Sequence, residues 1–103
     1  MGKYFLSPEA LEDLDTIWEY IAKDNPEAAD RVVESAYRDC ANLAAHPQLG
    51  PLARFPNNDL PDIRFFVLTD FPNYMIFYRI TTDGVDIVRI FHGAQDINDL
   101  FGP

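Results

Sequence analysis

The residues of this chain that are best suited to acid–base chemistry lie near its end, where His92 closes a run of apolar and β-branched residues. A histidine that acts as a general base needs a carboxylate that orients its ring and a neighbouring site for the substrate. Asp96 follows shortly after and could supply the carboxylate. We favour the alternative, a structural His92 that hydrogen-bonds the turn into the tail.

Arginines on neighbouring predicted strands form a second candidate cluster, made of Arg64, Arg79 and Arg89. Guanidinium groups bind carboxylates and phosphates through paired hydrogen bonds. The cluster could therefore receive an acidic segment of a protein partner. A second interpretation stays open, in which these arginines form ion pairs at the sheet edges. The available carboxylates are Asp62, Asp70, Asp83 and Asp86.

A proline-rich stretch, residues 46–62, contains a further candidate pair, Arg54 and Phe55. Arginine and aromatic residues are enriched at interface hot spots, so an exposed pair would suit a partner; local packing is the alternative. The prolines predict a loop, and long loops in small domains are often functional. His46, at the start of the stretch, is best explained as a cation at a helix C-terminus.

The charge balance excludes several classes of function. The 103 residues carry a formal net charge of −9, whereas nucleic-acid binding relies on Lys and Arg at phosphates, so we expect no direct DNA or RNA partner. Asp13 and Asp15 cannot share a helix face, which excludes paired catalytic carboxylates there. The sequence has no metal-binding Cys/His cluster, phosphate-binding glycine loop or nucleophile elbow. We predict no catalytic residue, cofactor or metal.

The only cysteine, Cys40, falls on an apolar helical stripe and predicts a buried, reduced thiol. The first residues lack the apolar run of a signal peptide, and no stretch is apolar for long enough to cross a membrane. We therefore expect a soluble cytoplasmic protein that does not bind membranes.

Helix-start signals occur at Ser7-Pro8 and Asn25-Pro26, where a capping side chain precedes a proline suited to the first helical position. The short link between the helices predicts an antiparallel hairpin. Apolar residues recur at helical spacing and predict the buried faces: Leu11, Leu14, Ile17, Trp18 and Ile21 in the first helix, and Ala29, Val32, Val33, Ala36, Cys40, Leu43 and Ala44 in the second.

Strands are predicted at both ends of the chain. The first is short and aromatic, and the last three form a meander whose second turn contains the hairpin signal Asp83-Gly84. We predict one domain, residues 1–103, of the α+β class, with the helix hairpin packed on a mainly antiparallel sheet. The other sheet face could be an interaction surface. The predicted strands are Lys3–Leu6, Arg64–Thr69, Tyr74–Thr81 and Val85–Phe91.

Segments in this order resemble the RelE/ParE superfamily of type II toxins, and together they cover almost the whole chain. The opening LSPEALEDLDTIWEYI, residues 6–21, is most similar to the ParE branch. The other matching segments are LAAHPQLG (43–50), IRFFV (63–67), YMIFYRI (74–80) and IVRIFHGAQD (87–96).

The resemblance also separates the branches by chemistry. Cleavage of RNA requires positioned cations and a proton-transfer group, which the nuclease branch supplies with basic residues and an aromatic hydroxyl. At the corresponding positions this chain has Arg64 and Phe66 on one strand, Met75 on the next, and Gln95 and Phe101 in the tail. Only Arg64 remains a cation, which argues against a nuclease and against an enzyme of any kind.

The ParE resemblance implies a toxin that poisons DNA gyrase by protein–protein binding and is neutralised by a ParD-like antitoxin whose disordered tail folds onto it. An acidic toxin would favour a tail with apolar anchors and basic residues. The alternatives are a ribosome-dependent mRNA interferase that uses Arg64, Arg89 and His92, and a non-toxic partner-binding scaffold. The candidate partner-binding residues are Arg54, Phe55, Arg64, Tyr78, Arg79, Arg89, His92 and Gln95.

Overall fold

Both helices begin where a side chain caps the backbone directly before a proline. In the computed structural model, which describes residues 2–54 and 62–93, the Ser7 hydroxyl accepts a hydrogen bond from a first-turn N–H at 3.0 Å. The Asn25 side chain does the same at 3.1 Å. These caps confirm both predicted helix starts. The helices are α1 (Pro8–Ala22) and α2 (Pro26–Ala45).

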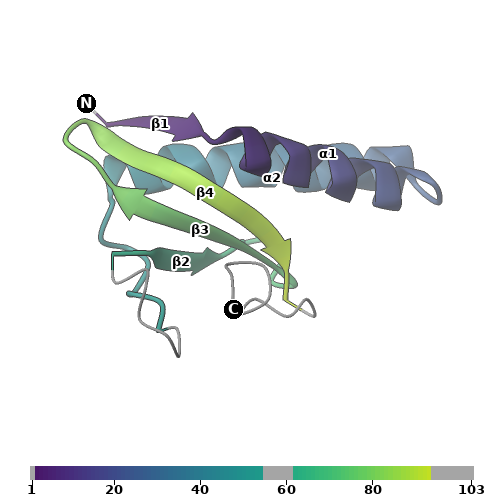
Figure 1. Cartoon of the computed structure of the whole chain (residues 1–103). Coiled ribbons are helices and arrows are strands. Elements are labelled where there is room, and N and C mark those ends of the chain that lie inside the picture. The colour runs from purple at the N-terminus through teal and green to yellow at the C-terminus, as the bar shows by residue number, and fades with distance from the viewer. Residues whose placement is uncertain (1, 55–61, 94–103) are drawn as a thin grey trace.

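The helices lie side by side as the predicted antiparallel hairpin (Figure 1). The indole N–H of Trp18 on α1 donates to the Asp30 carboxylate on α2 at 2.8 Å. The prediction that Leu11 and Trp18 are buried was wrong, since they are 46% and 38% exposed. Helical periodicity identifies an apolar stripe, but the packing angle decides which part of it meets the sheet. Among the described residues, no helix has the length and apolar character needed to cross a membrane.

Within the described residues the strands form a four-stranded sheet in the order β1-β4-β3-β2. The antiparallel meander of β2, β3 and β4 confirms the prediction. β1 pairs in parallel with β4, because the helix hairpin intervenes between them and carries the chain back to the same end of the sheet. Figure 1 shows β1 leading directly into α1. The strands are β1 (Lys3–Leu6), β2 (Arg64–Val67), β3 (Tyr74–Ile80) and β4 (Gly84–His92).

A β-bulge interrupts the pairing of β3 with β4. Phe77 is opposite Arg89 and the next residue, Tyr78, is opposite Ile87, which leaves Val88 as the extra residue. A bulge bends its strand and redirects nearby side chains. This bulge lies where the pairing of β4 with β1 ends and where α1 begins to contact β4.

The main core lies between the helices and one face of the sheet. Its buried members include Leu14 from α1, Cys40 and Leu43 from α2, and Ile76 and Ile87 from the sheet. α2 buries the predicted stripe except Val33, which is partly exposed, and it also buries a carboxylate that the pattern missed. This carboxylate, of Asp39, accepts hydrogen bonds from the backbone N–H of Thr69 at 2.9 Å and from its hydroxyl at 3.2 Å.

The opposite sheet face has a smaller apolar cluster, which we call the distal cluster. Its buried members are Ile63, Phe77 and Phe91. Apolar side chains therefore pack on both faces of the sheet. The partly buried residues packed against the distal cluster are Ala53, Phe65, Met75 and Val88.

The Cys40 thiol should be inert in the folded protein. The side chain is fully buried, and burial, followed by the nearby Asp39 carboxylate, raises its pKa to about 12. Thiolate is the reactive form, so at pH 8 only about one thiol in ten thousand could react even if it were accessible. We expect no labelling by a thiol-specific disulfide reagent in native buffer and stoichiometric labelling in urea. Rapid labelling of the native protein would contradict this burial.

Candidate functional site

The first turns of α1 lie along the edge of β4 that β1 leaves open. β1 pairs with β4 only as far as Ile87. From there the backbone N–H of Ser7 donates to the carbonyl of Ile87 at 2.9 Å, and its hydroxyl donates to the carbonyl of Val88 at 2.7 Å. The Asp13 carboxylate accepts a hydrogen bond from the backbone N–H of Ile90 at 2.9 Å. The N-cap residue Ser7 and the α1 residue Asp13 thus replace the missing strand.

The same carboxylate binds Arg89. The Nε and one terminal nitrogen of Arg89 each donate to a different oxygen of Asp13 at 2.8 Å. The two side chains are only 24% and 13% exposed. These hydrogen bonds raise the pKa of Arg89 above its ordinary value. The guanidinium also lies over the Phe91 ring, 4.5 Å from its centroid. The partner of Arg89 is therefore a helix residue and none of the four carboxylates that the sequence suggested.

A second polar cluster holds the loop after α2 against the sheet. The Tyr78 hydroxyl accepts a hydrogen bond from the N–H of Gly50 at 2.9 Å and donates to the carbonyl of Pro47 at 2.7 Å. Arg64 donates to the carbonyl of Gly50 at 2.7 Å. A Cβ on Gly50 would lie 2.2 Å from the carbonyl oxygen of Phe65, so only glycine fits here. Burial raises the pKa of Tyr78, partly offset by these polar neighbours.

Arg79 makes an ion pair with Asp62, one of the pairings that the sequence suggested. Nε lies 3.2 Å from a carboxylate oxygen, and the side chains are 40% and 62% exposed. Exposed pairs of this kind contribute little to stability. Arg79 therefore remains available to a partner, in contrast to Arg64 and Arg89. Arg54 is exposed as well.

The residues that occupy the positions of the nuclease branch's basic residues lie on different faces of the sheet. Cross-strand neighbours share a sheet face. Phe66 is opposite Ile76 and packs on the helix side, and Arg64 is opposite the buried Tyr78. Met75 packs on the other side, in the distal cluster. The side chains of Phe66 and Arg64 therefore point toward the helices, away from the distal face.

His92 lies at the end of β4 and pairs with Tyr74 of β3. The rings meet edge to face, with centroids 5.1 Å apart. The following residue, Gly93, donates its N–H to the carbonyl of Asn73 at 2.6 Å and closes this end of the hairpin. The predicted candidates Phe55 and Gln95, together with Asp96 and Phe101, lie outside the described residues.

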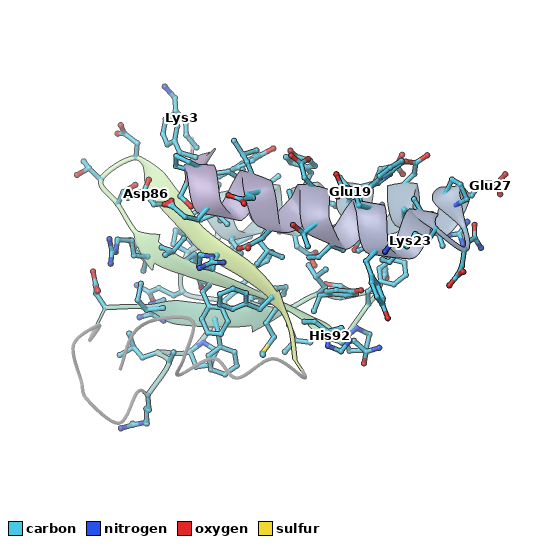
Figure 2. The ribbon with its side chains drawn as sticks, turned by 45° about the vertical axis from the view of Figure 1, so that its right-hand side comes forward. Lys3, Glu19, Lys23, Glu27, Asp86 and His92 are labelled. Atoms are coloured by element: carbon cyan, nitrogen blue, oxygen red, sulfur yellow. The ribbon has the colours of Figure 1, made fainter. Side chains whose placement is uncertain are left out.

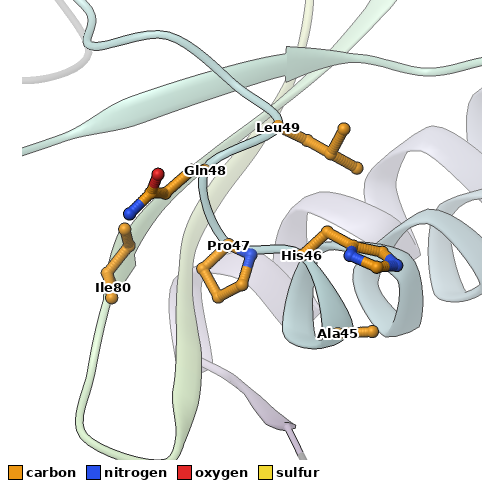
Figure 3. Close-up of a pocket in the computed structure, with 6 residues that line it drawn as sticks. All are labelled: Ala45, His46, Pro47, Gln48, Leu49 and Ile80. Carbon is orange, nitrogen blue, oxygen red and sulfur yellow. The ribbon is translucent and has the colours of Figure 1, made fainter.

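Two of the shallow depressions lie at opposite ends of β3. One, of about 510 Å³, lies between the end of α2 and β3, where Figure 3 shows Pro47 and Gln48 between Leu49 and Ile80. The other lies under α1 beside His92, at the right of Figure 2. In the described part of the chain, no group of three His, Cys, Asp or Glu residues could hold a metal.

Sequence reasoning identified the arginines and Tyr78 as candidates but missed the residues that bind them. For Asp13 the sequence only excluded a catalytic pair with Asp15, and Gly50 and Pro47 were assigned only to a loop. Asp13 and Arg89 are 76 positions apart, so no local spacing connects them. The glycine between Leu49 and Pro51 was the single local signal, because such a glycine often marks a close backbone approach.

The fold is shared with a solved structure from a toxin–antitoxin system. The structure superposes on a chain of the chromosomal ParDE toxin–antitoxin system from P. aeruginosa with a TM-score of 0.69 and 24% identity, covering 89% of this chain and 96% of the other. At this identity the likeness establishes the fold, an α+β domain of the RelE/ParE type.

The sequence establishes the family. The model of the family described as ParE toxin of the type II toxin–antitoxin system parDE matches residues 4–97. Y4kP of Sinorhizobium fredii, described as a candidate toxin, is 41% identical over 84% of this chain and 82% of its own length. Toxin RelE2 of Caulobacter vibrioides is 34% identical over 84% of this chain and 89% of its own length. The chain belongs to the ParE toxin family within the RelE/ParE superfamily and is the toxin of a type II toxin–antitoxin system.

Replacing Asp13 should destabilise the fold strongly. Asp13→Ala leaves a largely buried guanidinium and the Ile90 N–H without their acceptor, and breaking such a pair costs about 3 kcal/mol. The matched control is Asp15→Ala, an exposed acid on the same helix, which should change stability by less than about 0.5 kcal/mol. Urea unfolding followed by circular dichroism measures both. Equal stabilities for the two variants would contradict the role of Asp13.

Removing the Tyr78 hydroxyl should loosen the loop after α2. Tyr78→Phe leaves the Gly50 N–H and the Pro47 carbonyl without this partner, at a cost of about 1–3 kcal/mol. Hydrogen exchange of the Gly50 amide should accelerate by at least about tenfold. Tyr37→Phe is the control, since that hydroxyl belongs to a side chain 37% exposed on α2. An unchanged Gly50 exchange rate would show that the loop is held by other contacts.

Proposed function

We propose that this toxin acts by binding a protein, DNA gyrase, and that cleaved DNA then accumulates and replication stops. This mechanism requires a binding surface and no catalytic turnover. The observation that supports it most directly is the match to the ParE family over residues 4–97, because the ParE resemblance implies this target. The action would take place in the cytoplasm, where gyrase works.

The described part of the sheet supports binding over RNA cleavage. A nuclease needs cations aimed at the phosphate, and losing one such stabiliser costs about 3 kcal/mol of barrier. Arg89 is held by Asp13 and Arg64 by the Gly50 carbonyl. Both Phe66 and Met75 are apolar where the nuclease branch has cations; Met75 packs in the distal cluster and Phe66 packs on the helix side. The distal face of the described residues is thus better suited to a protein than to phosphate.

We further propose that a ParD-like antitoxin neutralises the toxin by covering the distal face. Phe65, Met75 and Val88 are partly exposed there and would accept apolar anchors. Arg79, on the same strand face as Met75, would bind a carboxylate of the tail. Arg64, Tyr78 and Arg89 would act by holding the surface in shape. The net charge of −9 favours a tail that contributes basic residues elsewhere along its path.

The second candidate function is ribosome-dependent mRNA cleavage, the activity that the resemblance to the RelE branch implies; the relative named toxin RelE2 is 34% identical. In that case Arg64, Arg89 and His92 would be its catalytic candidates. The third candidate, a non-toxic scaffold, predicts no growth arrest when the chain is expressed without its antitoxin.

Purified full-length toxin should inhibit supercoiling by gyrase and cause linear DNA to accumulate. Arg54→Ala/Arg79→Ala should weaken the inhibition by at least about tenfold, since hot-spot residues contribute more than about 1 kcal/mol each. Arg31→Ala, an exposed arginine of α2, is the matched control and should inhibit like the unmodified chain.

Primer extension on translated mRNA distinguishes the alternative. Cleaved transcripts together with unaffected gyrase would exclude the proposed target. If such cleavage persisted in an Arg64→Ala/His92→Ala variant, those residues would be excluded as its catalytic groups. Arrest that the neighbouring antitoxin gene fails to relieve would contradict the proposed neutralisation.

A further inference from the structure

The depression beside His92 has the composition of a binding pocket for a side chain. It lies between the second half of α1 and the adjoining ends of β3 and β4, and its volume is about 360 Å³. Figure 2 shows His92 at the end of β4, below this part of α1. The lining residues are Thr16, Ile17, Tyr20, Tyr74 and His92. This site lies on the helix side of the sheet, apart from the distal cluster.

Aromatic rings form the walls of this pocket. Tyr74 and His92 are cross-strand neighbours that meet edge to face at 5.1 Å, which fixes both rings. Tyr20 contributes a third ring from α1 and is 73% exposed. The phenol of Tyr74 is partly desolvated, which raises its pKa, and Tyr20 lies close enough to raise that pKa further. An exposed tyrosine and a partly buried one thus line the same opening.

The electrostatics of α1 favour a positive charge in this pocket. This helix carries five acidic residues and no Lys or Arg, and one of the five, Asp13, is engaged in the ion pair with Arg89. The last turn of α1 contains no basic residue, so its C-terminal carbonyls present their negative dipole end close to Tyr20. Lys23, which caps the helix, is the nearest cation in sequence.

We propose that this pocket binds an arginine side chain from a protein partner of the toxin. A guanidinium is planar and weakly hydrated, so it stacks on Tyr and His rings while it donates hydrogen bonds at its edge. The hydroxyls of Thr16, Tyr20 and Tyr74 are suitable acceptors. A leucine anchor would contact Ile17 but leave these hydroxyls without a partner. The proposal is independent of whether the toxin's target is gyrase.

The test uses the isotope-labelled full-length toxin and the peptide acetyl-Gly-Gly-Arg-Gly-Gly-amide, followed by NMR. The matched peptide has citrulline, which keeps the shape and loses the charge, and a third peptide has leucine. We expect saturable shifts of the Ile17 methyl and the Tyr20, Tyr74 and His92 ring resonances with the arginine peptide. The citrulline and leucine peptides should bind at least about fivefold more weakly. Added salt should weaken the binding of the arginine peptide.

Substitutions in the toxin complete the test. Tyr20→Leu removes one aromatic wall of the pocket at an exposed position. It should weaken the binding of the arginine peptide by at least about fivefold. Tyr37→Leu, at an exposed tyrosine of α2 away from the pocket, should leave binding unchanged. Equal binding of arginine and citrulline peptides, stronger binding of leucine, or unchanged binding to Tyr20→Leu would each overturn the proposal. Shifts spread evenly over the acidic surface without saturation would do the same.

Discussion

The structure depends on one carboxylate that completes the edge of the sheet. β1 separates from β4 after Ile87, and α1 then lies where a strand would continue. Asp13 accepts the N–H of Ile90 together with two donors of Arg89. A buried N–H without a partner costs about 1–3 kcal/mol, so a helix can cover this edge only if it carries an acceptor at this position. The orientation of α1 follows from that requirement.

This arrangement also decides which cations remain available to a partner. The chain has eight Lys and Arg residues, and internal contacts engage Arg64 and Arg89. What remains on the distal face is mainly apolar, with Arg79 at its edge. Shape and apolar contact therefore dominate that surface, which is what the proposed protein-binding mechanism requires. The acidic helices give the opposite side a different preference, for positively charged partner groups.

Local signals predicted most of the fold because each acts within a few residues. Ser7 and Asn25 cap helices in the structure as their sequence context predicted, and Asp83 lies in the turn directly before β4, which begins at Gly84. Burial was predicted less well. Leu11 and Trp18 are exposed and Asp39 is buried, because a periodic pattern contains no information on the angle at which a helix meets a sheet.

The sequence by itself determined the elements, their order, the α+β class and the toxin superfamily, since these depend on local propensity and on segments that recur in relatives. Only the tertiary structure decided the parallel pairing of β1, the hydrogen bonds between Tyr78 and the loop after α2, and the capture of Arg89 by Asp13. The physical reason is separation along the chain. Asp13 and Arg89 lie 76 positions apart in the sequence. A hydrogen bond between residues so far apart along the chain leaves no local pattern in either segment.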